Sequence, residues 1–314
     1  MSATRRNFLL LPALGLLPRA TQSDLVLPLA LPVTRLLFGG DVMLSRYVGI
    51  VARAKGDPGW PLRDVSVLLS SADIAFANLE SPFSDRGRVV EKGMVFKAEP
   101  EMIQALLQAG INVVSTANNH ARDCGGHGVE YTLDWLTQHG IAAVGTGSTT
   151  EEAHRGTVLG RNGVRFGFLA YTYDQSNGNH ADLDDRIAML DAGQVADDVK
   201  SMLERADVAI VSMHAGLEYS RKPNAQQQKF AHAAIDAGAS VVVGHHPHVT
   251  QPVESYSHGV IFYSLGNLVF DQFQQKETQR GWIADVRFVG KQLAGYNVIP
   301  VDIVRTAPRA SVAP

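Results

Sequence analysis

The chain has 314 residues, of which 45% are hydrophobic, so it can bury the core of one large domain or of two ordinary ones. Its formal net charge is -3 and its charges are well mixed, so no stretch of the sequence resembles the basic stripe of a nucleic-acid binder or a polybasic membrane patch. Its single cysteine, Cys124, excludes an internal disulfide and a cysteine-based zinc site, so a metal here would need His, Asp, Glu and Asn ligands.

The first 20 residues predict an export signal of the twin-arginine type. Arg5 and Arg6 precede an apolar run of about ten residues, which is too short to cross a bilayer roughly 30 Å thick as a helix. We therefore expect a periplasmic or otherwise extracytoplasmic protein with no transmembrane domain in the mature chain. An unstructured or amphipathic N-terminus is the alternative interpretation. Residues 21–32 are rich in Leu and Pro and are predicted to be a tether.

Between residues 33 and 306, short apolar runs alternate with helical patterns, which indicates one layered α/β domain. The Asn162-Gly163 pair predicts a β-hairpin, and with two late strands it indicates a mixed sheet or two packed sheets. Residues 307–314 are predicted to be a disordered tail. The expected strands are 34–40, 72–78, 111–116, 141–145, 164–172, 207–214, 239–244, 260–266, 281–290 and 296–305, and the expected helices are 99–110, 128–140, 192–206 and 224–238.

Polar side chains follow six of the expected strands. Ligands of open α/β sheets gather beyond the carboxyl ends of strands, so we expect one composite site. Taken singly, most of these residues have an ordinary explanation, such as a turn or helix cap for Asp41 or a satisfied histidine for His214. The residues are Asp41, Asn78, Glu80, Asn118, Asn119, His120, His214, Glu218, His245, His246, His248, Asn267 and Asp271.

Three histidines within four positions are the least ordinary of these features. Gly244 and Pro247 restrict the backbone, and in an extended stretch His246 and His248 would both be aimed with defined geometry. Imidazole, carboxylate and amide oxygen suit borderline divalent ions, so we expect one or two of Mn, Zn, Fe or Co. A di-metal pair clamps phosphate esters and generates a hydroxide at neutral pH.

Six stretches of the chain, in order, resemble the motifs of the capsule synthesis protein CapA family, also called the PgsA/CapA metallophosphatase-like family. They are FGGDVMLSR, ANLESPFSDRG, FKAEPEMIQALLQAGINVVSTANNHARDCGGHGVEYTLDWL, VSMHAGLEY, VVVGHHPHVTQPVE and IFYSLGNLVFDQ, and the resemblance spans residues 33 to 290. It implies a fold like the calcineurin-type metallophosphoesterases, which is an αββα sandwich of two mixed sheets with helices on both outer faces.

The resemblance also implies a role for individual residues. His120 corresponds to the catalytic imidazole, with Asp41 and Glu80 taking part in the chemistry and Glu80 standing where a bridging acid would be. Met43 stands where phosphoesterases have a His ligand, and its thioether is a poor ligand for hard ions, so the resemblance leaves open a depleted or absent metal site. The implied metal ligands are Asp41, Glu80, Asn119, His214, His246 and His248, and the other pocket residues are Asn78, Asn118, Glu218, His245 and Asn267.

The function expected from this resemblance is that of an exported enzyme acting on a cell-envelope polymer, such as poly-γ-glutamate, or on capsule precursors. Metal-assisted hydrolysis or transfer is the favoured reaction. The partners would be the anionic polymer or its precursor and a membrane-bound capsule synthesis complex, with no nucleic acid. Two alternatives stay open: a non-catalytic polymer-binding or assembly factor, and a metal-independent enzyme using the same cluster for acid-base chemistry.

Overall fold

The computed structural model describes residues 31–87, 93–172, 186–304 and 306–310. The predicted export signal and nearly all of the predicted tether lie outside these residues. Within the described part of the chain, no helix is long and apolar enough to cross a membrane.

The first sheet is mixed, with a parallel half that ends at the candidate site. Strands β1 to β4 run parallel, and β12 pairs antiparallel with β1. The strand order is β14-β13-β12-β1-β2-β3-β4, with β11 also paired to β1. The bounds are β1 (Val33–Val42), β2 (Ile74–Leu79), β3 (Val113–Ser115), β4 (Ala142–Val144), β11 (Asn267–Val269), β12 (Arg280–Val289), β13 (Gln292–Val304) and β14 (Ala307–Ala310).

The second sheet is also mixed, and it contains the predicted hairpin. Asn162 and Gly163 both have positive φ, 52° and 78°, as a two-residue turn between β5 and β6 requires. The order is β5-β6-β7-β8-β10-β9. Its strands are β5 (Thr157–Arg161), β6 (Val164–Thr172), β7 (Val208–His214), β8 (Val241–His245), β9 (Val253–Tyr256) and β10 (Gly259–Phe262).

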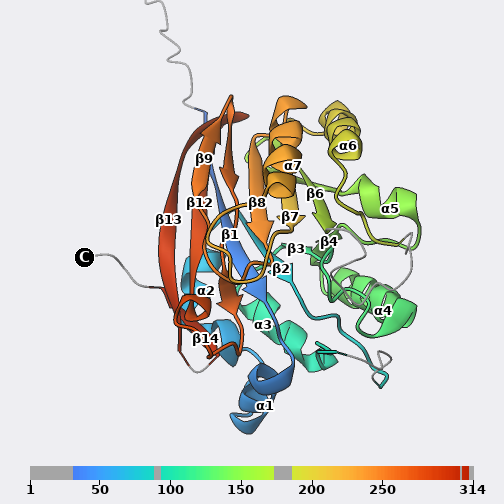
Figure 1. Cartoon of the computed structure of the whole chain (residues 1–314), viewed down its shortest axis with the longest axis vertical. Helices are drawn as coiled ribbons and strands as arrows, with labels where there is room; N and C mark the ends of the chain where they lie inside the picture. The colour runs from blue at the N-terminus through green and yellow to red at the C-terminus, as the bar shows by residue number, and fades with distance from the viewer. Residues whose placement is uncertain (1–30, 88–92, 173–185, 305, 311–314) are drawn as a thin grey trace, which may run out of the picture. The chain divides into compact units, whose positions relative to one another are not determined.

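Helices cover the outer faces of both sheets (Figure 1). The alternation of side chains along a strand explains the layers: Leu36 and Phe38 of β1 belong to the cluster between the sheets, whereas Leu37 belongs to the cluster under the helices. Helices α1 (Arg46–Ala54), α2 (Arg63–Ser70), α3 (Ile103–Gln108) and α4 (Gly125–Gln138) pack on the first sheet, and α5 (Thr150–Arg155), α6 (Ala192–Arg205) and α7 (Ala225–Asp236) pack on the second. The predicted αββα sandwich of two mixed sheets is therefore confirmed.

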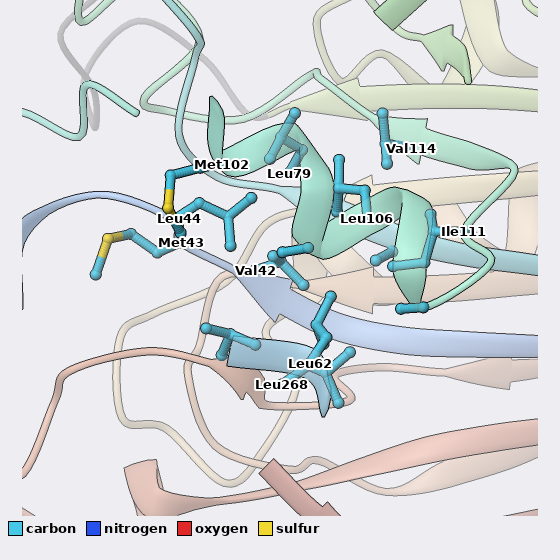
Figure 2. Close-up of a cluster of buried hydrophobic side chains, with 14 of the residues drawn as sticks. Val42, Met43, Leu44, Leu62, Leu79, Met102, Leu106, Ile111, Val114 and Leu268 are labelled. Atoms are coloured by element: carbon cyan, nitrogen blue, oxygen red, sulfur yellow. The ribbon is translucent and has the colours of Figure 1, made fainter. Parts of the chain in front are cut away.

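The core under the first group of helices begins directly beside β1. Figure 2 shows Leu106 of α3 among side chains of the sheet, including Val42, Leu79 and Val114. All four are buried, and each fully buried aliphatic side chain of this size stabilises the fold by about 1.5–3 kcal/mol relative to an exposed one. This packing fixes the end of β1, where Asp41 lies.

Three local predictions differ from the structure. The predicted helix 99–110 begins as a 3-10 turn at Pro100–Met102 and becomes α-helical only from Ile103. Helices α1 and α2 were not predicted, because each has fewer than ten residues and only two fully buried positions. The predicted disordered tail is wrong for residues 307–310, which form β14 because β13 offers them an antiparallel partner.

Two glycines let the strands approach closely next to the candidate site. A Cβ on Gly40 would stand 1.9 Å from the carbonyl oxygen of Gly266, and one on Gly244 would stand 1.9 Å from that of Tyr263. Both contacts are with backbone, so no side-chain rearrangement could relieve them. The glycines therefore allow β1 and β8 to bring their carboxyl ends close to the 263–267 segment.

Candidate metal centre

The carboxyl ends of strands from both sheets meet at one site. Asp41 of β1 lies in register with Asn78 of β2 and with Asn267 of β11. In the second sheet, His214 of β7 lies in register with His245 of β8. Parallel neighbours end at the same edge, so residues far apart in the sequence become neighbours, as expected for an open α/β fold.

Two groups of three buried side chains are arranged to hold cations. One group contains Asp41, Glu80 and His248, the other contains Glu80, His214 and His246, and within each group the ligand atoms lie within 4.8 Å of one another. Glu80 Oε1 is 3.9 Å from His214 Nε2 and 3.8 Å from His248 Nε2. Glu80 belongs to both groups, which is the arrangement of a carboxylate that bridges two ions.

Glu80 is a buried carboxylate without a hydrogen-bond partner among the described residues. Its side chain is completely buried, and neither oxygen accepts a hydrogen bond from any residue that the structure describes. Burial, followed by the negative charges of Asp41, Glu218 and Asp123, raises the pKa of Glu80 well above its usual value. An unpaired buried charge is costly, and a cation between the two groups would remove that cost, so the residues fit a metal centre.

Asp41 is held by several groups. Asn78 Nδ2 donates to Asp41 Oδ1 at 2.8 Å, and the backbone N–H of His246 donates to Oδ2 at 3.2 Å. Although burial raises its pKa, hydrogen bonds and charges from His245 and His248 lower the pKa of Asp41 well below the usual value. Asp41 is therefore charged at neutral pH, as a carboxylate that binds a cation must be.

The histidines of the second group are neutral at neutral pH. Burial, followed by the neighbouring His246, lowers the pKa of His214 well below its usual value. Burial and the charge of His248 lower the pKa of His246 to about 3. Neutral imidazole is the form that binds metal, so the site needs little proton release at these two positions. Asn119 Oδ1 lies 2.9 Å from His214 Nε2 and adds an amide oxygen to this group.

The backbone of the histidine cluster is strained, not extended as predicted. His246 has a φ of 95° and His248 a φ of 58°, both in the region that favours glycine. Each such residue costs about 1–3 kcal/mol, and such conformations cluster at active sites and ligand clamps. The turn brings the two ring centroids 5.9 Å apart and places one histidine in each group.

His120 lies beside the two groups and is positioned by a residue that was not predicted. Its Nδ1 is 2.7 Å from Asp123 Oδ2, which also accepts the backbone N–H of Phe96 at 2.6 Å. The Phe96 ring stacks on the imidazole with a centroid distance of 3.7 Å. His120 is 9% exposed, whereas Asp41, Glu80 and His214 are 0% exposed, so a substrate reaches His120 more readily. The His-x-x-Asp spacing was the available signal for Asp123.

Two of the other predicted pocket residues support the ligands. Asn78 Nδ2 lies 3.2 Å from His214 Nδ1 as well as bonding Asp41, and Asn118 Nδ2 donates to the carbonyl oxygen of Leu79 at 2.8 Å. Both asparagines therefore hold the backbone or side chains around Glu80 and Asp41.

Of the remaining predicted residues, Asn267 and His245 lie beside members of the first group and Glu218 belongs to neither group. Asn267 Oδ1 is 2.9 Å from His248 Nδ1, and His245 Nδ1 is 3.4 Å from Asp41 Oδ1. Glu218 is exposed and stands outside both groups, although its charge contributes to the raised pKa of Glu80. Met43 Sδ accepts hydrogen bonds from Ser45, and the side chain belongs to the apolar cluster of Figure 2, so it is not placed as a ligand.

Comparison with known proteins shows consistent similarity. The model of the family described as bacterial capsule synthesis protein PGA_cap matches residues 35–272. The PGA biosynthesis protein CapA of Bacillus subtilis is 32% identical over 276 residues, covering 86% of this chain and 72% of that protein. The capsule biosynthesis protein CapA of Bacillus anthracis is 30% identical over 282 residues, covering 86% of this chain and 67% of that protein.

A third relative and a solved structure extend the comparison. A probable polyglutamine synthesis accessory protein of Mycobacterium tuberculosis is 29% identical over 284 residues, covering 76% of this chain and 75% of that protein. The crystal structure of a hypothetical protein from Thermus thermophilus superposes with a TM-score of 0.54 at 18% identity, covering 86% of this chain and 99% of that one. This likeness concerns the fold alone.

Proposed function

We propose that this chain, which belongs to the bacterial capsule synthesis protein PGA_cap family, is a metal-dependent hydrolase or transferase. Its substrate would be an anionic cell-envelope polymer. The observation that carries the chemical part of the proposal is Glu80, a buried carboxylate without hydrogen bonds to described residues, shared by two groups of metal-ligand side chains. A protein that only binds a polymer does not need such an arrangement.

In this proposal, the residues of the site bind two ions and transfer a proton. Asp41 and His248 would hold one ion, Asn119, His214 and His246 the other, and Glu80 would bridge them. When bound, divalent ions would polarise the scissile bond and supply a hydroxide at neutral pH. His120, whose Nδ1 faces Asp123, presents Nε2 for proton transfer to the leaving group. Asn78 and Asn118 keep the ligands in place, and burial excludes bulk water.

The polymer part of the proposal rests on the relatives. Their names connect them with capsule, PGA and polyglutamine synthesis. We infer that poly-γ-glutamate or a capsule precursor is the substrate class, and that the protein works with a membrane-bound synthesis complex.

The deciding experiment is elemental analysis of the purified full chain, followed by assays against phosphoester, peptide and γ-glutamyl substrates with and without a chelator. Bound Mn, Zn, Fe or Co together with chelator-sensitive activity is the expected result. Activity that persists in chelator would instead support metal-independent acid-base chemistry. Polymer binding with neither metal nor activity would support the assembly-factor alternative.

We also propose export by the twin-arginine signal, which lies outside the described residues. Replacing both Arg5 and Arg6 by Lys should retain the protein in the cytoplasm, because the paired guanidinium groups are the recognised element of such a signal. Cell fractionation with immunoblotting measures this, and Arg19→Lys, in the same segment but outside the pair, should be exported normally. Unchanged delivery of the double variant would refute the proposal.

A further inference from the structure

The exposed side of helix α1 carries apolar side chains that the metal centre does not use. Tyr47 and Ile50 are 50% and 58% exposed, and the neighbouring Met94 and Phe273 are 57% and 42% exposed. They form one surface, because the rings of Tyr47 and Phe273 meet edge to face at 6.4 Å and Arg46 Nη1 lies 3.0 Å from Met94 Sδ. We call these four apolar residues, together with Arg53 and Lys55, the α1 face.

The charge of α1 is entirely positive. Residues 46–55 contain Arg46, Arg53 and Lys55 and no acidic residue. Arg46 pairs with Asp271 at 3.3 Å, whereas Arg53 has no ion pair among the residues that the structure describes. The opposite side of the helix is apolar and buried through Val48 and Ala52. The helix therefore joins the core on one side and exposes mixed apolar and cationic groups on the other.

A hollow of about 310 Å³ separates α1 from the segment around Lys97. Ile50 and Arg53 line it from the helix, and acidic residues line it as well: Asp57, Glu99 and Glu101. Asp57 pairs with Arg63, and Glu99 lies 3.4 Å from Lys97. Asp57 and Glu99 thus have cationic partners of their own, Arg63 and Lys97, and Glu101 is the third acid that lines the hollow with Arg53.

The α1 face lies next to the proposed proton donor. The Arg46 guanidinium stands 5.4 Å from the centroid of the Phe96 ring, and the same ring stacks on His120. Helix α1 also follows Asp41 after only a short turn, and it stands at the lower edge of the molecule in Figure 1. A surface that covers the α1 face would therefore lie close to the Phe96 ring on which His120 stacks.

We propose that the α1 face docks the protein on an anionic lipid bilayer surface. An interfacial helix buries apolar and aromatic side chains at the boundary between headgroups and acyl chains, while basic side chains contact anionic headgroups. The apolar and aromatic side chains of the α1 face are Tyr47, Ile50, Met94 and Phe273. Its basic side chains are Arg53 and Lys55. The contact does not depend on metal-assisted chemistry, so it extends beyond the function proposed above. It would hold His120 close to a polymer growing at the membrane.

A single introduced cysteine can report this contact. Cys124 is 1% exposed, and burial raises the pKa of its thiol to about 11, so it should resist labelling. Ile50→Cys in the full chain is labelled with an environment-sensitive fluorophore and mixed with vesicles of phosphatidylcholine with or without phosphatidylglycerol. Val67→Cys is the matched control, because Val67 is 82% exposed on the neighbouring helix α2, outside the α1 face. Any contact made by the N-terminal residues is common to both proteins.

We expect the label at residue 50 to brighten and shift to shorter wavelength only with phosphatidylglycerol, and the label at residue 67 to stay unchanged. Adding Arg53→Gln and Lys55→Gln to the Ile50→Cys protein should weaken the vesicle affinity by roughly tenfold or more. Phe273→Cys provides a second reporter and should behave like Ile50→Cys. An unchanged signal at both reporters, or an equal change at residue 67, would overturn the proposal. A change that needs no vesicles and grows with protein concentration would also overturn it, in favour of self-association.

Discussion

Glu80→Gln should empty the metal centre and remove its activity. Glu80 is the one residue common to both groups of ligand side chains. The amide of Gln carries no negative charge, so it would not hold two cations as the carboxylate would. Loss of a residue that supports a metal ligand typically costs 10-fold to 100-fold in affinity or activity, so loss of the bridging ligand itself should cost at least about 100-fold. Elemental analysis and initial rates on the same preparation measure both effects.

The same substitution should stabilise the metal-free protein at neutral pH. The folded state raises the pKa of Glu80 above its ordinary value of 4.5, so the stability of the wild-type protein falls as the pH rises from 4.5 through the raised value. Gln does not ionise, so the variant does not lose stability over this pH range. In chelator, thermal unfolding of Glu80→Gln should therefore occur at a higher temperature than that of the wild-type protein at pH 7, and the difference should vanish below about pH 4.

The matched control for this prediction is Glu218→Gln. Glu218 is an exposed acid near the same site but belongs to neither group, so its loss should leave metal content and thermal stability nearly unchanged. Retention of full metal content and activity by Glu80→Gln would show that Glu80 does not bridge ions.

Asp123→Asn should lower the turnover number while leaving metal content intact. The carboxylate holds the Nδ1–H of His120 and so keeps the Nε2 atom available for proton transfer, whereas an amide can stabilise the other tautomer. General acid-base catalysis contributes between about 100-fold and about 10,000-fold, and we expect a loss of kcat in this range with little change in KM. Steady-state kinetics of the purified variant measure kcat and KM, and elemental analysis measures its metal content.

The chain offers a matched pair as a control for this substitution. Asp85 and His127 form an equally short contact of 2.7 Å, but both are at the surface and belong to no ligand group. Asp85→Asn should therefore leave kcat, KM and metal content unchanged. If Asp123→Asn loses its metal, or if KM rises in step with the fall in kcat, Asp123 supports the fold of the site and does not position His120.

The strands were predictable because their signals are local. An apolar run of four to eight residues between turn residues indicates a buried strand wherever it pairs, and the runs ending before Asp41, His214 and His245 all form strands. Helix α1 was not predictable in the same way. It has nine residues with Gly49 in the middle, and only two positions are fully buried, so its pattern is too short to distinguish from a loop.

The candidate site was predictable in composition but not in arrangement. Strand-end polar residues pointed to Asp41, Asn119 and the histidine pair, and the structure brings these residues together. The positive φ values of His246 and His248 could not be foreseen, because nothing in a His-Pro-His sequence indicates the left-handed region. Asp123 had only the His-x-x-Asp spacing as a signal, and that spacing did not indicate that the Phe96 backbone and the His120 ring meet at one carboxylate oxygen.

By itself the sequence determined which residues stand at strand ends, because apolar runs and the turn residues that bound them are patterns of a few neighbouring positions. Only the tertiary structure decided which of these residues share an ion-sized space. Asp41 and His248, for example, lie far apart in the sequence but belong to one group of ligand side chains, with His248 Nδ1 3.5 Å from Asp41 Oδ2. The packing of two sheets also left Glu80 buried without a hydrogen bond among the described residues. Burial, and with it the cost of an uncompensated charge, depends on every layer of the fold at once, and no local pattern of residues encodes it.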